Sequence, residues 1–220
     1  MKKRVVRSDL WINPVFDERL AQAQDIDFQI FPVRGDRDLA LKLLSQAHVY
    51  QVSAAKDELP QEWFVSAGLI AQCPQLLRVS STGAGYDTVD VAACTAAGIA
   101  VVNQAGGNAD SVAEHTLALM LSVSRRMVES DRRMRREQGF TREDVMGHEI
   151  RGKTMGLVGM GHIGTRVARL AQAFGMQVLA VDPFLSAEDI QKRGARSVRF
   201  SELLAQSDVC RCTAHATPQP

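Results

Sequence analysis

Three glycines in the second half of the chain have the spacing of a dinucleotide-binding turn. Gly159, Gly161 and Gly164 form the pattern G-x-G-x-x-G. The first glycine permits a tight turn, the second lets backbone amides approach a pyrophosphate, and the third lets a helix pack closely against a strand. His162 and Ile163 lie between the last two glycines, where we expect backbone contact with the pyrophosphate rather than catalysis. Because glycine is common, chance matches to this pattern are frequent, and it indicates a dinucleotide site only between a strand and a helix.

The residues around the glycines supply those surroundings. A strand-like run, "TMGLVG", enters the first glycine, an amphipathic helix follows, and "QVLAV" is the next strand. Asp182 ends that strand, about 20 residues after the glycines, where an acidic side chain accepts hydrogen bonds from the adenosine ribose. Its charge repels a 2′-phosphate, and Pro183 and Phe184 offer no arginine to one. We therefore predict NAD as cofactor rather than NADP, and disfavour a plain strand–turn–helix without ligand.

Composition excludes several other classes of function. The 220 residues are 45% hydrophobic and 23% charged, with a net charge of +1, which argues against nucleic acid or anionic lipid as partner. No apolar run reaches the roughly 20 residues of a membrane span, and no signal peptide is evident. The four cysteines are too few and too scattered for a disulfide framework. We expect a soluble cytoplasmic protein without a metal site.

The elements that must position the glycines alternate between strands and helices. Such alternation predicts βαβ units and parallel sheets, hence an α/β fold. Strands are predicted at residues 27–33, 48–54, 76–81 and 99–104, and helices at residues 37–47, 60–73 and 89–98.

A change in composition at residues 103–108 predicts a domain boundary. The run "AGGNAD" is flexible, and the long helix after it begins with a possible capping box, Ser111 with Glu114. We place a first domain at residues 1–103 and a second at 104–220. The arginine-rich run at residues 124–140 is interrupted by acidic residues, so we interpret it as a solvated helix face.

Two stretches identify a family. "STGAGYDTVDVAACTAAGIAVVNQAGGNADSVAEHTLALML", followed by "GHEIRGKTMGLVGMGHIG", resembles the D-isomer-specific 2-hydroxyacid dehydrogenases, a group that includes D-3-phosphoglycerate dehydrogenase. The resemblance runs from Leu77 to Asp208 and holds only in pattern upstream. It implies a flavodoxin-like substrate domain, a Rossmann-like NAD domain, of which this chain has only part, and hydride transfer between NAD and a 2-hydroxy or 2-keto acid.

The resemblance also implies roles for single residues. The turn Gly83-Ala84-Gly85 would offer backbone amides to the substrate carboxylate. From the residues alone, a tight turn without a ligand explains these glycines equally well. Thr116 matches a position that touches the cofactor, and a core-facing threonine is the simpler interpretation. The family's Arg, Glu and His catalytic residues are expected beyond Pro220, so none is assigned here. Relatives commonly form homodimers through the NAD domain.

The C-terminal run "CRCTAHATPQP" departs from the family, which continues here into a buried strand. One base restored after the Val209 codon permits V-V-S-L-H, the expected strand, so we hypothesise a frameshift and a truncated, inactive chain. A divergent terminus is the alternative explanation.

Two other functions remain open. One is a non-catalytic NAD-binding or sensing protein. The other is a different two-domain NAD enzyme, such as an alanine dehydrogenase-like or adenosylhomocysteinase-like protein, but the "GAGYD" to "VAEH" stretch argues against it.

Overall fold

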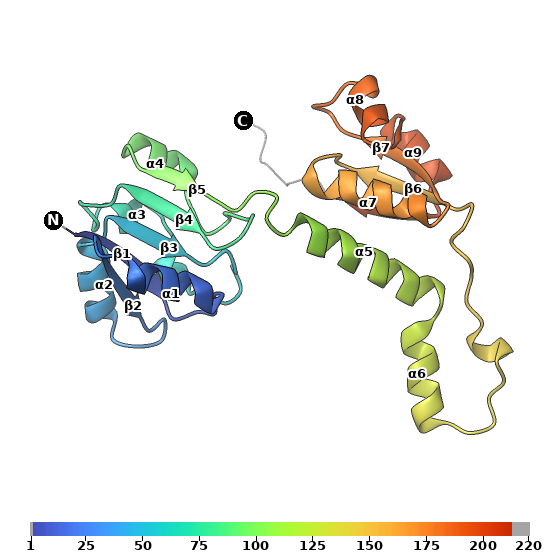
Figure 1. Cartoon of the computed structure of the whole chain (residues 1–220), viewed down its shortest axis with the longest axis horizontal. Helices are drawn as coiled ribbons and strands as arrows, with labels where there is room; N and C mark the ends of the chain where they lie inside the picture. Colours follow the sequence, from blue (N-terminus) through green and yellow to red (C-terminus); the bar gives the residue numbers. More distant parts are fainter. Residues whose placement is uncertain (1, 213–220) are drawn as a thin grey trace. The chain divides into compact units, whose positions relative to one another are not determined.

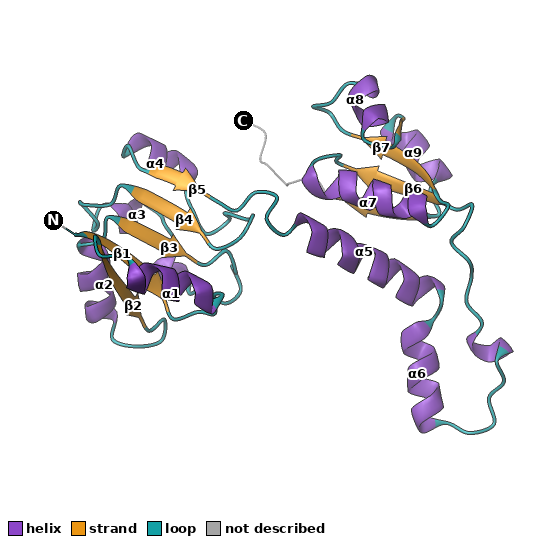
Figure 2. Cartoon of the chain, viewed as in Figure 1, coloured by secondary structure: helices purple, strands orange, loops and turns teal. Residues whose placement is uncertain are grey.

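A computed structural model describes residues 2–212 of the chain. The chain divides into two compact units, Met1–Asn108 and Ala109–Pro220. Each unit is built on a parallel β-sheet with helices against it (Figures 1 and 2), which confirms the predicted α/β class with two parallel sheets.

The first unit contains a five-stranded sheet in the order β2-β1-β3-β4-β5, and every neighbouring pair is parallel. This is the flavodoxin-like order, in which the chain reverses direction across the sheet between β1 and β3. Ligands of such sheets bind outside the carboxyl ends of the strands near that reversal. The strands are β1 (Lys3–Ser8), β2 (Ile26–Phe31), β3 (Val49–Val52), β4 (Arg78–Ser81) and β5 (Ala100–Val102).

Aromatic side chains form the centre of the first unit's core. The Phe31 and Trp63 rings lie 5.1 Å apart, and Tyr50 donates a hydrogen bond to the Trp63 carbonyl at 3.1 Å. Both polar groups of these buried rings are thus satisfied, since the Trp63 indole donates to the Val33 carbonyl. The helices packed around this core are α1 (Pro14–Gln22), α2 (Arg37–Ser45), η1 (Gln61–Trp63), α3 (Ala67–Ile70) and α4 (Val91–Ala96).

The single helix predicted at residues 60–73 is wrong. A 3₁₀ turn ends at Trp63, the backbone extends, and α3 begins only at Ala67. Val65 lies between them, buried, and forms a parallel bridge with Val89. Burial of Trp63 and Val65 therefore overrides helix propensity, and Ser66 restarts the helix by accepting the Leu69 amide.

The second unit contains a four-stranded sheet in the order β8-β7-β6-β9. Counted along the chain this is 3-2-1-4, the arrangement of a nucleotide-binding Rossmann half with its crevice between the first and fourth strands. The strands are β6 (Thr154–Val158), β7 (Gln177–Val181), β8 (Arg196–Ser197) and β9 (Val209–Cys212), and the helices that follow them in the unit are α7 (His162–Ala173), α8 (Ala187–Lys192) and α9 (Phe200–Gln206).

Two further helices open the second unit, α5 (Ala109–Ser124) and α6 (Met127–Arg136). The predicted capping box is wrong, because α5 already begins at Ala109 and Ser111 lies inside its first turn. Ala113, Leu117 and Met120 are buried, so one face of α5 packs on the core of the second unit.

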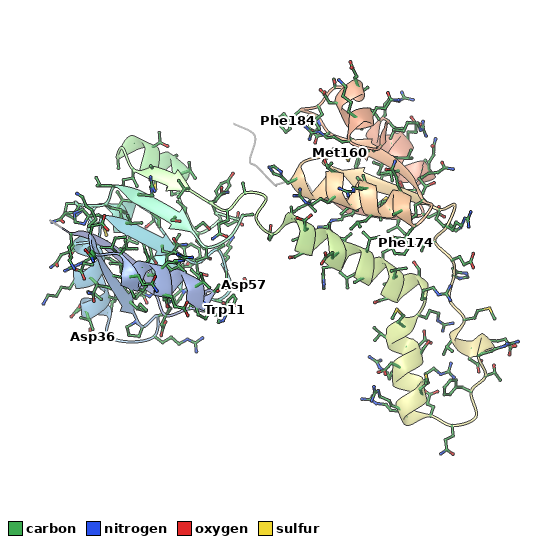
Figure 3. The ribbon with its side chains drawn as sticks, in the orientation of Figure 1. Trp11, Asp36, Asp57, Met160, Phe174 and Phe184 are labelled. Carbon is green, nitrogen blue, oxygen red and sulfur yellow. The ribbon has the colours of Figure 1, made fainter. Side chains whose placement is uncertain are left out.

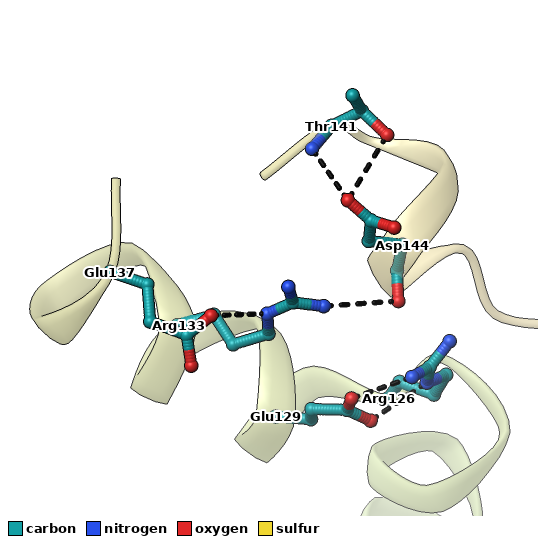
Figure 4. Close-up of polar contacts among 6 residues, drawn as sticks. All are labelled: Arg126, Glu129, Arg133, Glu137, Thr141 and Asp144. Carbon is teal, nitrogen blue, oxygen red and sulfur yellow. Dashed lines mark hydrogen bonds and ion pairs between the residues drawn. The ribbon is translucent and has the colours of Figure 1, made fainter. Parts of the chain in front are cut away.

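Helix α6 is tied to the segment that returns from it, which includes the turn η2 (Glu143–Val145). Figure 4 shows Arg133 between the Glu137 carboxylate and the Asp144 carbonyl, while Arg126 pairs with Glu129. The interpretation of this run as a solvated face fits these ion pairs, because they lie at the surface and α6 has no buried residue.

The run that departs from the family pattern still forms strand β9. Val209, Cys210, Arg211 and Cys212 pair in register with Met155 to Val158 of β6. The Arg211 side chain is half-buried and its Nε atom has no hydrogen-bond partner among the described residues. The strand therefore forms against the sequence expectation, at the cost of an unsatisfied polar group, and residues 213–220 lie outside the described part.

Candidate functional site

The glycine pattern lies at the junction of β6 and α7, as predicted. Gly159 has φ +97°, a conformation that side chains rarely adopt, and its amide donates to the Val181 carbonyl at 2.8 Å. Gly161 is the N-cap of α7, and α7 has no side-chain cap. Gly164 is buried in α7, which packs against β6 and β7. The turn therefore presents an uncapped helix N-terminus beside the carboxyl end of β6.

The space around Gly161 is open. A Cβ atom added there would meet no other heavy atom within 4 Å, and its φ of −73° suits any residue. The protein's own packing therefore does not require glycine at this position. A ligand that approaches the backbone closely does require it, since a methyl group would occupy the space above the amides.

Asp182 lies at the carboxyl end of β7 and holds this turn in place. Its Oδ2 atom accepts the Met160 amide at 2.8 Å, and Oδ1 accepts the Phe184 amide at 2.9 Å. The carboxylate is thus fixed beside the turn by two backbone donors, with Phe184 itself 86% exposed. Figure 3 shows Met160 and Phe184 at the same end of the second unit.

Two residues that sequence reasoning missed support the turn from the other side. Arg193, at the end of α8, donates to the Met160 carbonyl at 2.6 Å. Thr165 donates its hydroxyl to the carbonyls of Met160 and Gly161, at 3.1 and 2.8 Å. No arginine directly follows Asp182 in the sequence, but the fold brings Arg193 to the same turn, where it donates to the backbone.

These features fit a dinucleotide. The open backbone at Gly161 and the uncapped start of α7 suit a pyrophosphate, because helix N-termini carry unpaired N–H groups and partial positive charge. Asp182 lies one strand away, where a ribose diol would reach its carboxylate. His162 is exposed and Ile163 half-buried in the first turn of α7.

Thr116 is placed differently from these residues. It is half-buried on α5, and its hydroxyl donates to the Val112 carbonyl one turn earlier at 2.7 Å. It borders a groove of about 310 Å³ that also touches Met155 and the β9 strand. The hydroxyl is therefore used by the helix itself in this structure.

In the first unit, the turn Gly83-Ala84-Gly85 follows β4 and has all three of its carbonyls occupied. Gln104 donates its amide to Gly83 at 3.0 Å, Asn103 donates its side-chain amide to Ala84 at 2.8 Å, and the Ser81 hydroxyl donates to Gly85 at 2.5 Å. Among the described residues, the three amide groups of the turn have no acceptor. With its acceptors used and its donors unused, this turn is suited to bind an anion.

Comparison with known proteins agrees with this geometry. A family model described as "D-isomer specific 2-hydroxyacid dehydrogenase, NAD binding domain" matches residues 117–220. The chain belongs to this family. Its second unit is accordingly NAD-binding, which confirms the predicted cofactor.

Similar proteins include two D-3-phosphoglycerate dehydrogenases. The one from Archaeoglobus fulgidus is 43% identical over 145 residues, which cover 66% of this chain and 27% of the relative. The one from Mycobacterium tuberculosis H37Rv is 38% identical over 184 residues, covering 84% of this chain and 33% of the relative. This dehydrogenase-family chain thus spans about a third of the length of the curated relatives it matches.

Solved structures share the fold over nearly the whole chain. An NAD-dependent formate dehydrogenase from Staphylococcus aureus in complex with NAD has a TM-score of 0.80 and 26% identity, covering 98% of this chain and 66% of its own. A D-lactate dehydrogenase from Aquifex aeolicus complexed with NAD and lactic acid has a TM-score of 0.78 and 25% identity, with 96% and 60% covered.

The histidines of the described part form no acid–base pair. No histidine side chain there hydrogen-bonds a carboxylate. His48 instead accepts the Arg4 backbone amide at its Nδ1 atom, at 3.0 Å. Burial, with Lys3 and Arg4 nearby, lowers the pKa of His48, so the His48 imidazole favours its neutral form.

Within residues 2–212, no group of three or more His, Cys, Asp or Glu side chains could hold a metal ion. None of the helices in the same residues has the length and apolar character of a membrane span.

Proposed function

We propose that this chain forms the substrate-binding and NAD-binding parts of a D-2-hydroxyacid dehydrogenase. The observation that carries the proposal is the turn between β6 and α7, open at Gly161 and held by Asp182. Bound NAD would supply the hydride acceptor or donor. The chain's own residues would bind and orient: Gly161, His162 and Ile163 through the backbone at the pyrophosphate, with Gly164 keeping α7 close to the sheet, and Asp182 at the ribose.

The first unit would bind the acid. We propose that the amides of Gly83, Ala84 and Gly85 bind the carboxylate of a small 2-hydroxy or 2-keto acid. Support comes from the three occupied carbonyls, which fix the turn, and from its position at the carboxyl end of β4 in a flavodoxin-like sheet. Thr116 stays a candidate cofactor contact whose hydroxyl would first have to leave Val112.

We further propose that the 220 residues by themselves show little or no turnover. When hydride leaves the hydroxyl-bearing carbon, a base must accept the hydroxyl proton, and in the reverse reaction an acid must return it to the carbonyl oxygen. A histidine held by a carboxylate suits both roles. The described residues contain no such pair. The same observation supports an alternative function, in which the chain binds or senses NAD without catalysis.

A homodimer formed through the second unit is also proposed. Along α5 and α6, Leu119, Val123, Val128 and Met134 are exposed apolar side chains in a chain with a net charge near zero. Large exposed apolar patches mark association surfaces. Light scattering of the purified chain should give twice the monomer mass, and the variant Val128→Glu with Met134→Glu should give the monomer mass.

The test of the cofactor site is isothermal titration calorimetry of residues 1–220 with NAD. We expect Gly161→Ala to abolish measurable binding with the melting temperature unchanged, because the added methyl meets only the ligand. Gly68→Ala is the matched control, since its new Cβ would lie 3.8 Å from the Ser66 hydroxyl, an ordinary contact. If Gly161→Ala binds NAD as tightly as the unaltered chain, the pyrophosphate assignment is wrong.

Turnover is measured on the same sample with NADH and a panel of 2-keto acids. NAD binding without NADH oxidation supports the proposal for the isolated chain. Oxidation at an ordinary enzymatic rate contradicts it, because it would show that the 220 residues contain a working acid–base group.

A further inference from the structure

A crevice in the first unit adjoins the Gly83-Ala84-Gly85 turn. It has a volume of about 550 Å³ and lies at the carboxyl ends of the strands, with Ala54 and Ala55 after β3 and Thr82 after β4 on its wall. Thr82 directly precedes the turn, and Ala54 would lie 3.2 Å from a Cβ added at Gly83. An acid whose carboxylate is held by the turn would therefore extend its remaining atoms into this crevice.

The surface of the crevice is more apolar than polar, although Asn13, Ser53, Thr82 and Gln104 also line it. Trp11 and Ile12, from the loop after β1, line it together with Ala54 and Ala55. Trp11 is 83% exposed, in contrast to the buried Trp63, so its indole is available for contact with a ligand. Trp11 also borders the neighbouring hollow of about 460 Å³, as does Asp57, and Figure 3 shows the two side chains at the same end of the unit.

The charges at this edge are mostly negative. Glu58 is the charged residue that lines the crevice, and Asp9, Asp57 and Glu58 line the neighbouring hollow with one cation, Arg34. Three carboxylates against one guanidinium leave two net negative charges there.

The other charged groups near this edge do not reverse that balance. Arg7 lies beneath the β1–α1 loop and is paired with both oxygens of Asp17. Lys56 is exposed and lines neither hollow, while Asp87 lies 4.0 Å from the position of a Cβ at Gly85. A second anionic group on the substrate would meet carboxylates rather than arginines.

We propose that this crevice is the side-chain subsite of the substrate and that it takes 2-hydroxy or 2-keto acids with an uncharged, apolar remainder. It discriminates against acids with a second negative charge, through Glu58 and its acidic neighbours. The inference rests on the proposed function of the turn. It separates this chain from its relatives named for phosphoglycerate, whose substrate carries a phosphate.

The test is nuclear magnetic resonance on the ¹⁵N-labelled 220-residue chain, titrated with 4-methyl-2-oxopentanoate or 2-oxoglutarate at equal ionic strength. The indole N–H of Trp11, assigned with Trp11→Phe, reports on the crevice, and the amides of Ala84 and Gly85 report on the carboxylate. We expect 4-methyl-2-oxopentanoate to shift all three signals and 2-oxoglutarate to bind about tenfold more weakly.

A charge reversal completes the experiment. Glu58→Lys should tighten 2-oxoglutarate binding about tenfold and leave 4-methyl-2-oxopentanoate within twofold. Glu18→Lys is the matched control, because it makes the same charge change on α1 outside both hollows, and it should alter neither affinity.

The inference is overturned if 2-oxoglutarate binds as tightly as the apolar acid, if Glu58→Lys has no effect, or if neither acid shifts the Trp11 signal. Shifts at Ala84 and Gly85 without a shift at Trp11 would leave the turn as a carboxylate site and remove the crevice from it. Calorimetry with NAD on the same sample keeps the outcomes apart, since cofactor binding can hold when the subsite fails.

Discussion

The Asp182 carboxylate accepts the amide of Met160 at 2.8 Å, across 22 residues of sequence. The residue proposed to bind the ribose thus also fixes the turn proposed to bind the pyrophosphate. Its second oxygen accepts the Phe184 amide, so both oxygens have backbone donors. One side chain therefore joins the two halves of the proposed cofactor site before any ligand arrives, which would reduce the ordering that binding requires.

Removal of this carboxylate should weaken NAD binding more than loss of a single ribose contact. Hydrogen bonds to charged groups contribute about 1.5–3 kcal/mol each, so we expect Asp182→Ala to lower NAD affinity by at least about tenfold in calorimetry. Asp182→Asn keeps an acceptor for the Met160 amide but loses the negative charge that would repel the 2′-phosphate of NADP. The ratio of NAD affinity to NADP affinity should therefore fall. Glu188→Ala, on the exposed side of α8, is the control. Unchanged affinity in Asp182→Ala would contradict both roles.

Gly159 and Gly161 should respond in opposite ways to alanine. Gly159 has φ +97°, so a side chain there is strained, and we expect Gly159→Ala to cost about 1–3 kcal/mol of unfolding free energy in thermal or urea denaturation. Gly161→Ala adds a methyl group to open space and should leave stability unchanged while it abolishes NAD binding. Equal stability of the two variants would show that the turn relaxes without penalty.

The strand, glycine turn and helix at residues 154–182 were predictable because their signals are local. Strand, glycine spacing, helix and acidic residue follow one another within residues 154–182, and each reflects backbone geometry that neighbouring residues impose. The alternation of strands and helices likewise predicted parallel sheets, because such connections need crossovers.

The features that were missed depend on contacts between distant residues. Nothing near Arg193 in the sequence indicates that its guanidinium reaches Met160, 33 positions earlier. The break between Trp63 and α3 follows from the bridge of Val65 with Val89, which no helical periodicity reveals. Strand β1 was missed because charged residues flank its two valines, and only pairing with β2 and β3 buries them.

The stability of the first unit should rise as the pH rises through about 6.5. Burial, Lys3 and Arg4 lower the pKa of His48, so the unfolded chain binds more protons than the folded chain as pH falls through the ordinary histidine value near 6.5. Protonation also puts a hydrogen on the Nδ1 atom that accepts the Arg4 amide. Urea denaturation followed by tryptophan fluorescence should show this slope, because Trp11 and Trp63 both lie in the first unit.

The variant His48→Gln separates this histidine from other titrating groups. Its side-chain oxygen can accept the Arg4 amide without titrating, so the rise in stability near pH 6.5 should disappear. Asp27 does not interfere, because hydrogen bonds from Gln29 and Arg4 lower its pKa and its contribution is lost only at more acidic pH. A slope that persists in His48→Gln would assign the pH dependence to another group.

The ion pair between Arg7 of β1 and Asp17 of α1 should contribute more to stability than the exposed pair between α2 and η1. Arg7 is 8% exposed, donates from two nitrogens to the Asp17 carboxylate, and also donates to the Ser8 and Leu10 carbonyls. Asp17→Ala leaves a nearly buried guanidinium without its counter-charge, for which we expect a loss of about 3 kcal/mol in urea denaturation. Glu62→Ala breaks the exposed pair with Arg37 and should cost at most about 1 kcal/mol, because solvent screens both partners. Equal losses in the two variants would mean that burial of Arg7 does not set the strength of its pairing, and the carbonyl contacts would then be its main support.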